Sequence, residues 1–474
     1  MRTILVSNRI VEPRRGAAMP GGLAAALQVA TEKYGAWWIG SSDKHTRDAK
    51  EQTRFETPIN IAVAGKGRLI TVDFPPSSYQ QFYNGMANSV LWPILHDRAD
   101  LLRYDPDFLA AYHAINDAMA GAVTRIAEPD SLIWVHDYHY FTLGQCLRRQ
   151  DLNNPIGFFL HTPFPTASVL SCLPSNREIM KCLSAYDLIG FQTSADLLRF
   201  RHYATSELAA TMIGQMALNF GSRRVNLGVF PIGIDSDRFA AAAQRIGKTR
   251  RLARMRRDLH DGSLVIGVDR LDYTKGLPLR FKAYERFLTL FPTERKRVSF
   301  LQITPPTRSE VECYRNFRAE LASTAGDINA RFGGVDWTVL RYLNEGFSPE
   351  ELAGFYRLSK AGCVTPLRDG MNLVAKEYVA AQDPENPGVL VLSKFAGAAQ
   401  ELNAAIIVNP YDTDEVARGL QHALHMPLTE RLERWQTLDR ILRKGSLQGW
   451  YDSFLVALRT ASIRPADDAA LNVA

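Results

Sequence analysis

The chain has 474 residues, 46% of them hydrophobic and 22% charged, so it can build a packed interior and exceeds what one core normally serves. Lys and Arg outnumber Asp and Glu by 56 to 50, a net charge of +6 that is small for so large a surface. This balance disfavours a nucleic-acid partner and suits small phosphorylated ligands. No apolar stretch approaches the ~20 residues of a membrane-spanning helix, so we expect no membrane partner.

The cysteines and the N-terminus indicate the compartment. The five cysteines are an odd number, with no CxxC pair and no His nearby at zinc spacing. Reduced thiols of this kind are typical of the cytosol. The apolar run before Asn8 and Arg9 is too short for the core of a signal peptide. We therefore expect a cytoplasmic protein.

Short β-branched or aromatic runs alternate with longer segments of helical period along the whole chain. The first set of predicted strands is ILVSNRI, SLIWVHDY, IGFFLH, DLIGFQ and VNLGVFPIGI. After a basic, Ala-rich helical stretch, a second set follows: SLVIGVDRLDY, RVSFLQIT, TVLRYL, GCVTPL, GVLVLS and AIIVNP. This alternation predicts parallel sheets with crossover helices. The fold class is therefore α/β, with two doubly wound, Rossmann-like domains.

We place the first domain boundary at Asp235, which gives domains 1–235 and 236–450 and leaves 451–474 as a C-terminal helix with a frayed tail. Trp435 and Trp450 are the expected packing anchors of the final helices. The stretch KTRRLARMRRDLH could form a basic helix face for nucleic acid. It lacks the interleaved aromatic residues that stack bases, so a solvated linker helix is the better interpretation.

Polar residues follow several predicted strands of the first domain. Arg9 ends the first strand, and Gly21 and Gly22 open the next helix, where a guanidinium and backbone N–H groups could hold a phosphate. A Gly-Gly turn that merely allows positive φ explains the pair equally well. Asp137 and His161 follow two strands whose carboxyl ends face one crevice. The HDYH stretch lacks the helical spacing of zinc motifs, and we predict no metal site.

Two cations follow the first strand of the second domain. Arg270 and Lys275, in VDRLDYTKG, lie in a strand-to-helix loop where they would neutralise a diphosphate. The alternative is an ordinary surface ion pair with Asp269 or Asp272. Arg308 lies just beyond the strand FLQIT and is a second candidate anion contact.

The segment TPLRDGMNLVAKE, residues 365–377, combines a strand end, a tight loop and a helix predicted over residues 371–381. The helix N-terminus favours negative charge, and Gly370 permits close approach of a ligand to the backbone. Asp369 could accept hydrogen bonds from sugar hydroxyls, and Glu377 from a ribose diol. Ordinary helix capping is the alternative for both acids. We predict a donor-sugar and ribose site here.

Taken in order, SNR with GGL, NSVLWP, HDYH, HTPFP, RLDYTKG, the PPTRSEV loop and DGMNLVAKEYVAAQ resemble the trehalose-6-phosphate synthases. The resemblance covers nearly the whole chain, and so many ordered motifs are far more specific than any one of them. It implies a GT-B fold with a catalytic cleft between the two domains and a C-terminal helix that crosses back to the first. It also implies retaining transfer of glucose from UDP-glucose to glucose-6-phosphate, giving α,α-trehalose-6-phosphate and UDP.

The same resemblance implies roles for individual residues. The residues that would contact the acceptor are Arg9, Tyr83, Trp92, Asp137 and Arg308. The residues that would contact the donor are Gly21, Gly22, His161, Arg270, Lys275, Phe347, Asp369, Gly370, Met371, Asn372, Leu373, Val374 and Glu377. Those assigned to catalysis are Asp137, His161, Arg270, Lys275 and Asp369. No metal or other cofactor is implied, and the assembly would be a homo-oligomer, a tetramer by resemblance.

Some details depart from the usual family pattern. Thr162 stands where Ile is common, Asp269 stands where Glu often precedes the Arg, and residues 42–66 match poorly. UDP, GDP and ADP donors therefore stay open. The rival functions are a synthase with another acceptor, such as a glucosylglycerol-phosphate synthase or a cyclitol pseudo-glycosyltransferase, and a non-catalytic nucleotide-sugar sensor. A phosphorylase would need a cofactor lysine that the sequence does not show.

Overall fold

The computed structural model describes residues 2–10, 22–42, 58–247, 249–259, 262–305 and 312–462. The chain separates into two compact units. The first contains the described residues up to Pro231 together with the chain from Trp450, and the second contains Ile232–Gly449. The resemblance implies that the first domain, 1–235, binds the acceptor and that the second, 236–450, binds the nucleotide sugar, and these two roles stay predictions.

The first unit is built on a sheet that, within the described residues, has ten strands in the order β3-β4-β2-β1-β5-β6-β7-β10-β9-β8. Neighbouring strands run parallel from β4 to β10, and antiparallel pairs add strands at both edges. The five predicted strands are confirmed as β1, β5, β6, β7 and β10. The bounds are β1 (Thr3–Arg9), β2 (Trp37–Ser41), β3 (Ile59–Ala64), β4 (Gly67–Val72), β5 (Leu132–His136), β6 (Ile156–Leu160), β7 (Leu188–Phe191), β8 (Thr211–Ile213), β9 (Ala217–Phe220) and β10 (Arg223–Val229).

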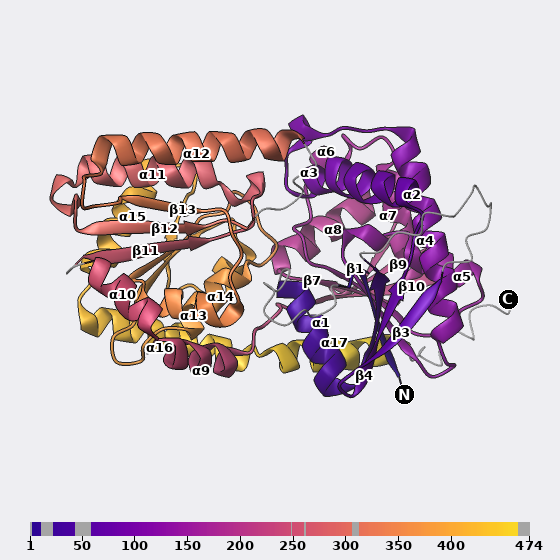
Figure 1. Ribbon diagram of the computed structural model, residues 1–474. Helices are drawn as coiled ribbons and strands as arrows, with labels where there is room; N and C mark the ends of the chain where they lie inside the picture. Colours follow the sequence, from indigo (N-terminus) through magenta and orange to yellow (C-terminus); the bar gives the residue numbers. More distant parts are fainter. Residues whose placement is uncertain are drawn as a thin grey trace. The chain divides into compact units, whose positions relative to one another are not determined.

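Helices cover this sheet on both faces (Figure 1). The longest is α4, whose first turn begins with a proline and is capped by Asp105, which accepts a hydrogen bond from the Asp107 N–H. The described helices of the first unit are α1 (Gly22–Tyr34), α2 (Pro76–Gln80), η1 (Gln81–Leu91), α3 (Trp92–Leu95), η2 (Ala99–Leu101), α4 (Pro106–Ile126), η3 (Tyr138–Tyr140), α5 (Leu143–Arg149), α6 (Ala167–Leu170), α7 (Asn176–Lys181), η4 (Cys182–Ala185) and α8 (Ser194–Glu207), together with α17 (Leu447–Ser462) from Trp450 onward.

In the part of the second unit that the structure describes, the sheet has six strands in the order β13-β12-β11-β14-β15-β16. All of its strand pairs are parallel, as the continuous apolar runs predict. The six predicted strands are confirmed, and with the first sheet they confirm the α/β class with two doubly wound units. The bounds are β11 (Ser263–Val268), β12 (Val298–Ile303), β13 (Leu340–Leu343), β14 (Ala361–Val364), β15 (Val389–Ser393) and β16 (Ile406–Val408).

Helices lie on both faces of this sheet as well (Figure 1). In α11, Leu277, Phe281 and Tyr284 are fully buried at the spacing of one helix face. The helices of the second unit are α9 (Ser236–Ile246), α10 (Arg250–Asp258), η5 (Tyr273–Lys275), α11 (Leu277–Leu290), η6 (Pro292–Glu294), α12 (Glu312–Phe332), α13 (Pro349–Leu358), α14 (Leu373–Ala380), η7 (Gly397–Gln400), α15 (Thr413–His425) and α16 (Leu428–Lys444).

The C-terminal helix α17 packs into the core of the first unit. Phe454 is fully buried and stacks on Trp134, with ring centroids 4.1 Å apart. Gly157 in β6 and Gly190 in β7 make room for it, because a Cβ at either glycine would lie 2.7 or 2.8 Å from the Phe454 ring. Trp450 is buried beside the same tryptophan, with ring centroids 4.7 Å apart. Trp450 is therefore a packing anchor, as predicted.

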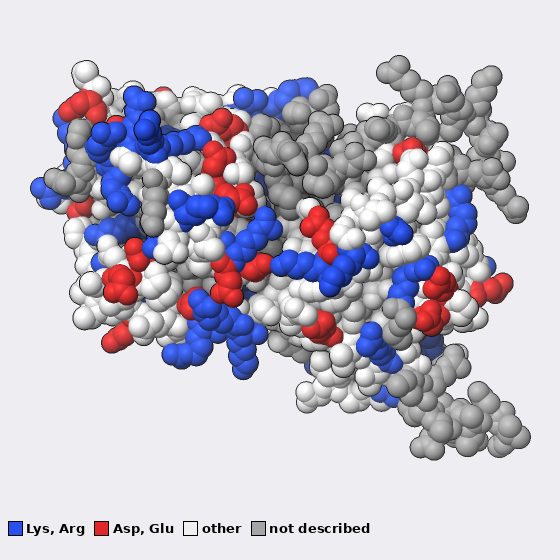
Figure 2. Space-filling model, turned by 60° about the horizontal axis from the view of Figure 1, so that its bottom comes forward, with Lys and Arg blue, Asp and Glu red and all other residues white. Residues whose placement is uncertain are grey.

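The basic helix α10 is largely exposed and keeps only Leu252 deeply buried. On the face that Figure 2 shows, Lys and Arg are interspersed with Asp and Glu and form no continuous track. The solvated-helix interpretation fits this surface better than a nucleic-acid site. Among the helices that the structure describes, none combines the length and the apolar character needed to cross a bilayer.

Candidate functional site

Two histidines of the first unit meet at the carboxyl ends of β5 and β6. His136 Nδ1 lies 3.1 Å from His161 Nε2, and Gln192 Nε2 lies 3.2 Å from His161 Nδ1. Both ring nitrogens of His161 are therefore used within the protein. Burial lowers the pKa of His161 to about 3. Burial also lowers the pKa of His136, and the neighbouring His161 ring lowers it further. His161 is a neutral, oriented ring at physiological pH.

Asp137 follows β5 in a backbone conformation that is rare outside glycine, with φ 73° and ψ 170°. Its N–H donates to the Phe159 carbonyl at 2.8 Å, and its Oδ1 accepts from the His161 N–H at 3.2 Å. The two adjacent strands thus hold Asp137 and His161 together, as the sequence predicts. Strain of about 1–3 kcal/mol persists only where the surroundings fix the residue, and such residues cluster at functional sites.

The predicted acceptor residues Tyr83 and Trp92 lie on a π-helical segment and just after it. In η1, the Asn88 side chain donates to the Tyr83 carbonyl, five residues earlier, at 2.7 Å, which supports the wider turn. The guanidinium of Arg9 lies 5.8 Å from the centre of the Tyr83 ring. Trp92 is buried against Tyr138, with ring centroids 5.7 Å apart. The structure therefore brings Arg9 and Tyr83 together. Trp92 packs separately, against an aromatic residue that follows β5.

In the second unit, the two predicted loops meet through an ion pair. Lys275 Nζ lies 2.5 Å from Asp369 Oδ2, and both side chains are largely buried. Asn372 Nδ2 donates to the same oxygen at 3.0 Å. Asp272 instead accepts from the Thr274 N–H at 3.0 Å. The surface ion pair with Asp269 or Asp272 considered for Lys275 is thus replaced by a pair that joins the ends of β11 and β14.

The helix after this loop begins two residues later than predicted. Asn372 has φ 77°, which cannot continue a right-handed helix, and its side chain caps α14 by accepting from the Ala375 N–H. Capping therefore falls to Asn372 and not to Asp369. Residues of η7 hold the backbone of this loop: the Gly397 N–H donates to the Asp369 carbonyl, and the Ala398 N–H donates to the Met371 carbonyl.

Glu377 and Phe347 both contact residues of α13. Glu377, on α14, accepts from the Tyr356 hydroxyl at 3.3 Å, and burial raises its pKa to about 7. Phe347, just before α13, is mostly buried and packs edge-on against Phe355, with ring centroids 5.2 Å apart. The guanidinium of Arg251 lies 5.3 Å from the Phe347 ring. These contacts leave little of the Phe347 ring for a nucleobase.

The remaining predicted residues fall into two groups. Gly21 and Arg308 lie outside the described residues. Arg270 is exposed in the loop after β11, and Gly370 and Met371 are buried in the loop before α14. Two further donor candidates, Leu373 and Val374, form the half-buried first turn of α14, and Gly22 is the first residue of α1. The roles assigned to these residues stay predictions.

The sequence profile of glycosyltransferase family 20 matches residues 10–460. The chain belongs to glycosyltransferase family 20. The trehalose-6-phosphate synthase of Sinorhizobium fredii is 44% identical over 467 residues, which cover 98% of this chain and 99% of that protein. The predicted family and its enzymatic class are therefore confirmed, and this family 20 chain is a glycosyltransferase.

Two solved structures are similar to this chain in fold as well as in sequence. An α,α-trehalose-phosphate synthase (UDP-forming) from Burkholderia xenovorans, in complex with glucose-6-phosphate, is 41% identical, with a TM-score of 0.93 over 97% of this chain and 100% of that chain. An E. coli structure bound with UDP-2-fluoro glucose is 38% identical, with a TM-score of 0.91 over 98% of this chain and 100% of that one. The predicted GT-B fold is confirmed.

Two groups of the family 20 chain were missed by the sequence patterns. Gln192 directly follows β7, so the strand-end rule that found Asp137 and His161 applies to it as well. Arg280 is buried inside α11, where the apolar face of the helix offers no strand-end signal. A charged residue three positions after Leu277 on a buried helix face was the available clue.

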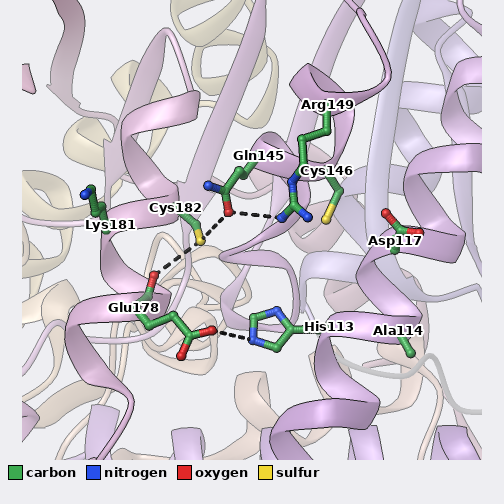
Figure 3. Close-up of a pocket in the computed structure, with 9 residues that line it drawn as sticks. All are labelled: His113, Ala114, Asp117, Gln145, Cys146, Arg149, Glu178, Lys181 and Cys182. Carbon is green, nitrogen blue, oxygen red and sulfur yellow. Dashed lines mark hydrogen bonds and ion pairs between the residues drawn. The ribbon is translucent and has the colours of Figure 1, made fainter.

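A separate cavity of about 620 Å³ opens among α4, α5, α7 and η4. Figure 3 shows its lining: His113, Ala114, Asp117, Gln145, Cys146, Arg149, Glu178, Lys181 and Cys182. Burial raises the pKa of Cys146 to about 11 and that of Cys182 to about 12, so both thiols are protonated near neutral pH. None of the predicted site residues lines this cavity, and its thiols are not poised for nucleophilic chemistry.

Proposed function

We propose that the chain transfers glucose from UDP-glucose to glucose-6-phosphate with retention, giving α,α-trehalose-6-phosphate and UDP. The observation that carries this proposal is the meeting of Lys275 with Asp369 beside the Arg270 loop, at neighbouring parallel strand ends. Cations suit a diphosphate, and a carboxylate with a helix N-terminus suits sugar hydroxyls and phosphate. The UDP-forming relatives, one of them bound to glucose-6-phosphate, support this pair of substrates.

The second unit would carry the leaving-group chemistry. Breaking the anomeric C–O bond develops positive charge on the sugar and negative charge on the departing diphosphate. Arg270 and Lys275 would stabilise the diphosphate, and Lys275 would exchange its partner Asp369 for a phosphate oxygen. Asp369, released in this way, could accept hydrogen bonds from the glucose hydroxyls. This route needs no metal ion.

The first unit would position the reacting groups. His161 is neutral and both of its ring nitrogens already have partners, so it is a poor proton carrier. We assign to His161 and Asp137 the orientation of the donor sugar and the acceptor. The acceptor hydroxyl would attack from the face that the diphosphate leaves, and a leaving phosphate oxygen would take its proton. Arg9 and Tyr83 would hold the acceptor phosphate.

One assay tests the proposal. Purified protein is given each of UDP-, GDP- and ADP-glucose with glucose-6-phosphate or glycerol-3-phosphate, and the products are identified by mass spectrometry. We expect trehalose-6-phosphate from UDP-glucose and glucose-6-phosphate. Turnover with glycerol-3-phosphate alone would favour the rival synthase, whereas nucleotide-sugar binding without any turnover would favour the sensor.

Donor binding should depend on pH through Glu377. Its pKa of about 7 means that the carboxylate form, the better acceptor for two ribose hydroxyls, accumulates as pH rises. The affinity for UDP-glucose, whose diphosphate does not titrate near neutrality, should rise up to ~10-fold from pH 6 to pH 8. Calorimetry on the wild type and Glu377→Gln measures this. A variant that keeps the full pH dependence would contradict the role of Glu377.

The same raised pKa has a consequence for stability with the opposite sign. Between the unfolded pKa of 4.5 and the folded pKa of about 7, the folded state binds more protons at Glu377 than the unfolded state. The contribution of this residue to folding stability should therefore fall as pH rises through that window. Bound UDP-glucose, which favours the carboxylate, should offset this loss.

Removal of divalent metals should leave activity unchanged. The proposed stabilisation of the diphosphate comes from Arg270, Lys275 and the N-terminus of α14. In the part of the chain that the structure describes, no group of three or more His, Cys, Asp or Glu is placed to hold a metal ion. After dialysis against a chelator we expect the rate to stay within ~2-fold. A loss that Mg²⁺ restores would overturn the metal-free route.

The assembly and compartment follow as further proposals. We infer a cytoplasmic homo-oligomer, a tetramer by resemblance to the family. The cysteines at Cys146, Cys172, Cys182 and Cys363 are free thiols, which suits a reducing compartment. Light scattering coupled to size-exclusion chromatography would measure the oligomeric state, and a monomeric mass would contradict the tetramer.

A further inference from the structure

Arg280 is a charged side chain in the interior of the second unit. It lies on α11 between Leu277 and Phe281 and is only 1% exposed. A buried guanidinium is costly unless each of its donors finds an acceptor. The neighbouring residues are therefore expected to supply hydrogen-bond acceptors for the guanidinium.

Four groups accept hydrogen bonds from this guanidinium, and they come from four different segments. Nε donates to Thr365 Oγ1 at 2.8 Å, just after β14. Nη1 donates to Asp269 Oδ2, just after β11, and to Gln302 Oε1 of β12 at 3.0 Å. Nη2 donates to the Lys275 carbonyl at 3.3 Å. Arg280 thus ties together three adjacent strands and the η5 turn.

The segments held by Arg280 carry the proposed donor groups. Arg270 is the next residue after Asp269, and Lys275 is itself bonded through its carbonyl. Thr365 opens the loop that leads to Asp369. The two loops also touch directly, because the Leu367 N–H donates to the Thr274 carbonyl at 2.8 Å. The spacing between the cations and Asp369 therefore depends on the segments that Arg280 joins.

Only a planar fork can make this set of bonds. Arginine has five N–H donors in fixed directions, whereas lysine has one ammonium group on a flexible stem. Gly267 of β11 leaves space for the fork, because a Cβ there would lie 2.9 Å from Arg280 Nη1. The local sequence is thus fitted to a guanidinium.

We propose that Arg280 is a positioning residue that sets the distance between the Arg270–Lys275 loop and the Asp369 loop without touching substrate. This inference rests on the proposed function, since it assigns those loops to the donor. Perturbing Arg280 should impair the use of UDP-glucose and leave the affinity for glucose-6-phosphate unchanged.

The test compares Arg280→Lys with Arg286→Met in the full chain. Arg286 lies on the same helix and pairs with Asp414 at 2.6 Å, so it controls for loss of an ion pair on α11. For Arg280→Lys we expect kcat/KM for UDP-glucose to fall ~10-fold, because the charge stays but the fork is lost. The KM for glucose-6-phosphate should stay within ~2-fold and Tm within ~4 °C. Arg286→Met should match the wild type.

A second variant keeps the inference testable if Arg280→Lys does not fold. Thr365→Val keeps the side-chain volume and removes the acceptor for Nε, together with a hydrogen bond between the Thr365 side chain and the Cys363 thiol. We expect kcat/KM for UDP-glucose to fall ~3-fold, again without a change in the KM for glucose-6-phosphate. Wild-type kinetics in both variants, or an equal rise in KM for both substrates, would show a purely structural arginine and overturn the inference. If the wild type neither turns over nor binds UDP, the proposed function fails, and the inference with it.

Discussion

Replacing Arg270 with alanine is expected to lower kcat about 100-fold or more, a loss of at least ~2.7 kcal/mol of transition-state stabilisation. In the proposed reaction, negative charge appears on the diphosphate only as the anomeric bond breaks. A cation that acts on this charge contributes more in the transition state than in the ground state. The KM for UDP-glucose should therefore change much less than kcat. Steady-state kinetics with both substrates measures this split.

The side chain of Arg270 is exposed, so its removal should change folding stability by only ~0.5 kcal/mol. Arg257→Ala, at an exposed arginine of α10, is the matched control and should keep wild-type rates. Arg270→Lys should recover part of the activity, because it restores charge without the planar fork. A rate for Arg270→Ala within about threefold of the wild type would rule out the leaving-group role.

The strand ends explain why much of the site could be predicted. Parallel strands are continuous apolar runs, so their ends are visible in the sequence, and all of them end at one edge of the sheet. This rule alone placed Asp137 with His161 and Lys275 with Asp369, across long stretches of chain. The alternation of apolar strands with helical segments indicated the fold class. Two strands outside the prediction lie at the edges of the first unit's sheet: β3, whose apolar run INIAVA is mostly exposed, and β8, which has only three residues.

Other features depend on contacts that no local pattern reports. Arg280 bonds one residue of β12 and the residues that directly follow β11 and β14, and these meet only in the folded sheet. The start of α14 is set by the positive φ of Asn372, although Met371 has no local reason to stop a helix. The π-helical turns around Tyr83 rely on side-chain bonds to carbonyls five residues earlier. In each case tertiary or side-chain contacts override the local backbone preference.

Replacing Phe454 with alanine is expected to destabilise the first unit by about 3–5 kcal/mol. The ring is fully buried, stacks on Trp134 and fills the space left by Gly157 and Gly190. Two glycines in adjacent central strands cannot collapse into the cavity, because they have no side chains to move. The cost should therefore lie toward the upper end of that range. Urea unfolding followed by tryptophan fluorescence measures it, since Trp134 stacks on the ring and Trp450 lies beside Trp134.

Val456→Ala is the matched control on the same helix, because Val456 is 59% exposed and should cost no more than ~0.5 kcal/mol. Equal losses in the two variants would mean that α17 is not part of the core. The Phe454→Ala substitution should also affect the candidate site at His161. Trp450, one turn earlier, lies edge-on to His161 with ring centroids 6.1 Å apart. Loosening α17 should therefore free the His161 ring and lower kcat under conditions where the variant is still folded.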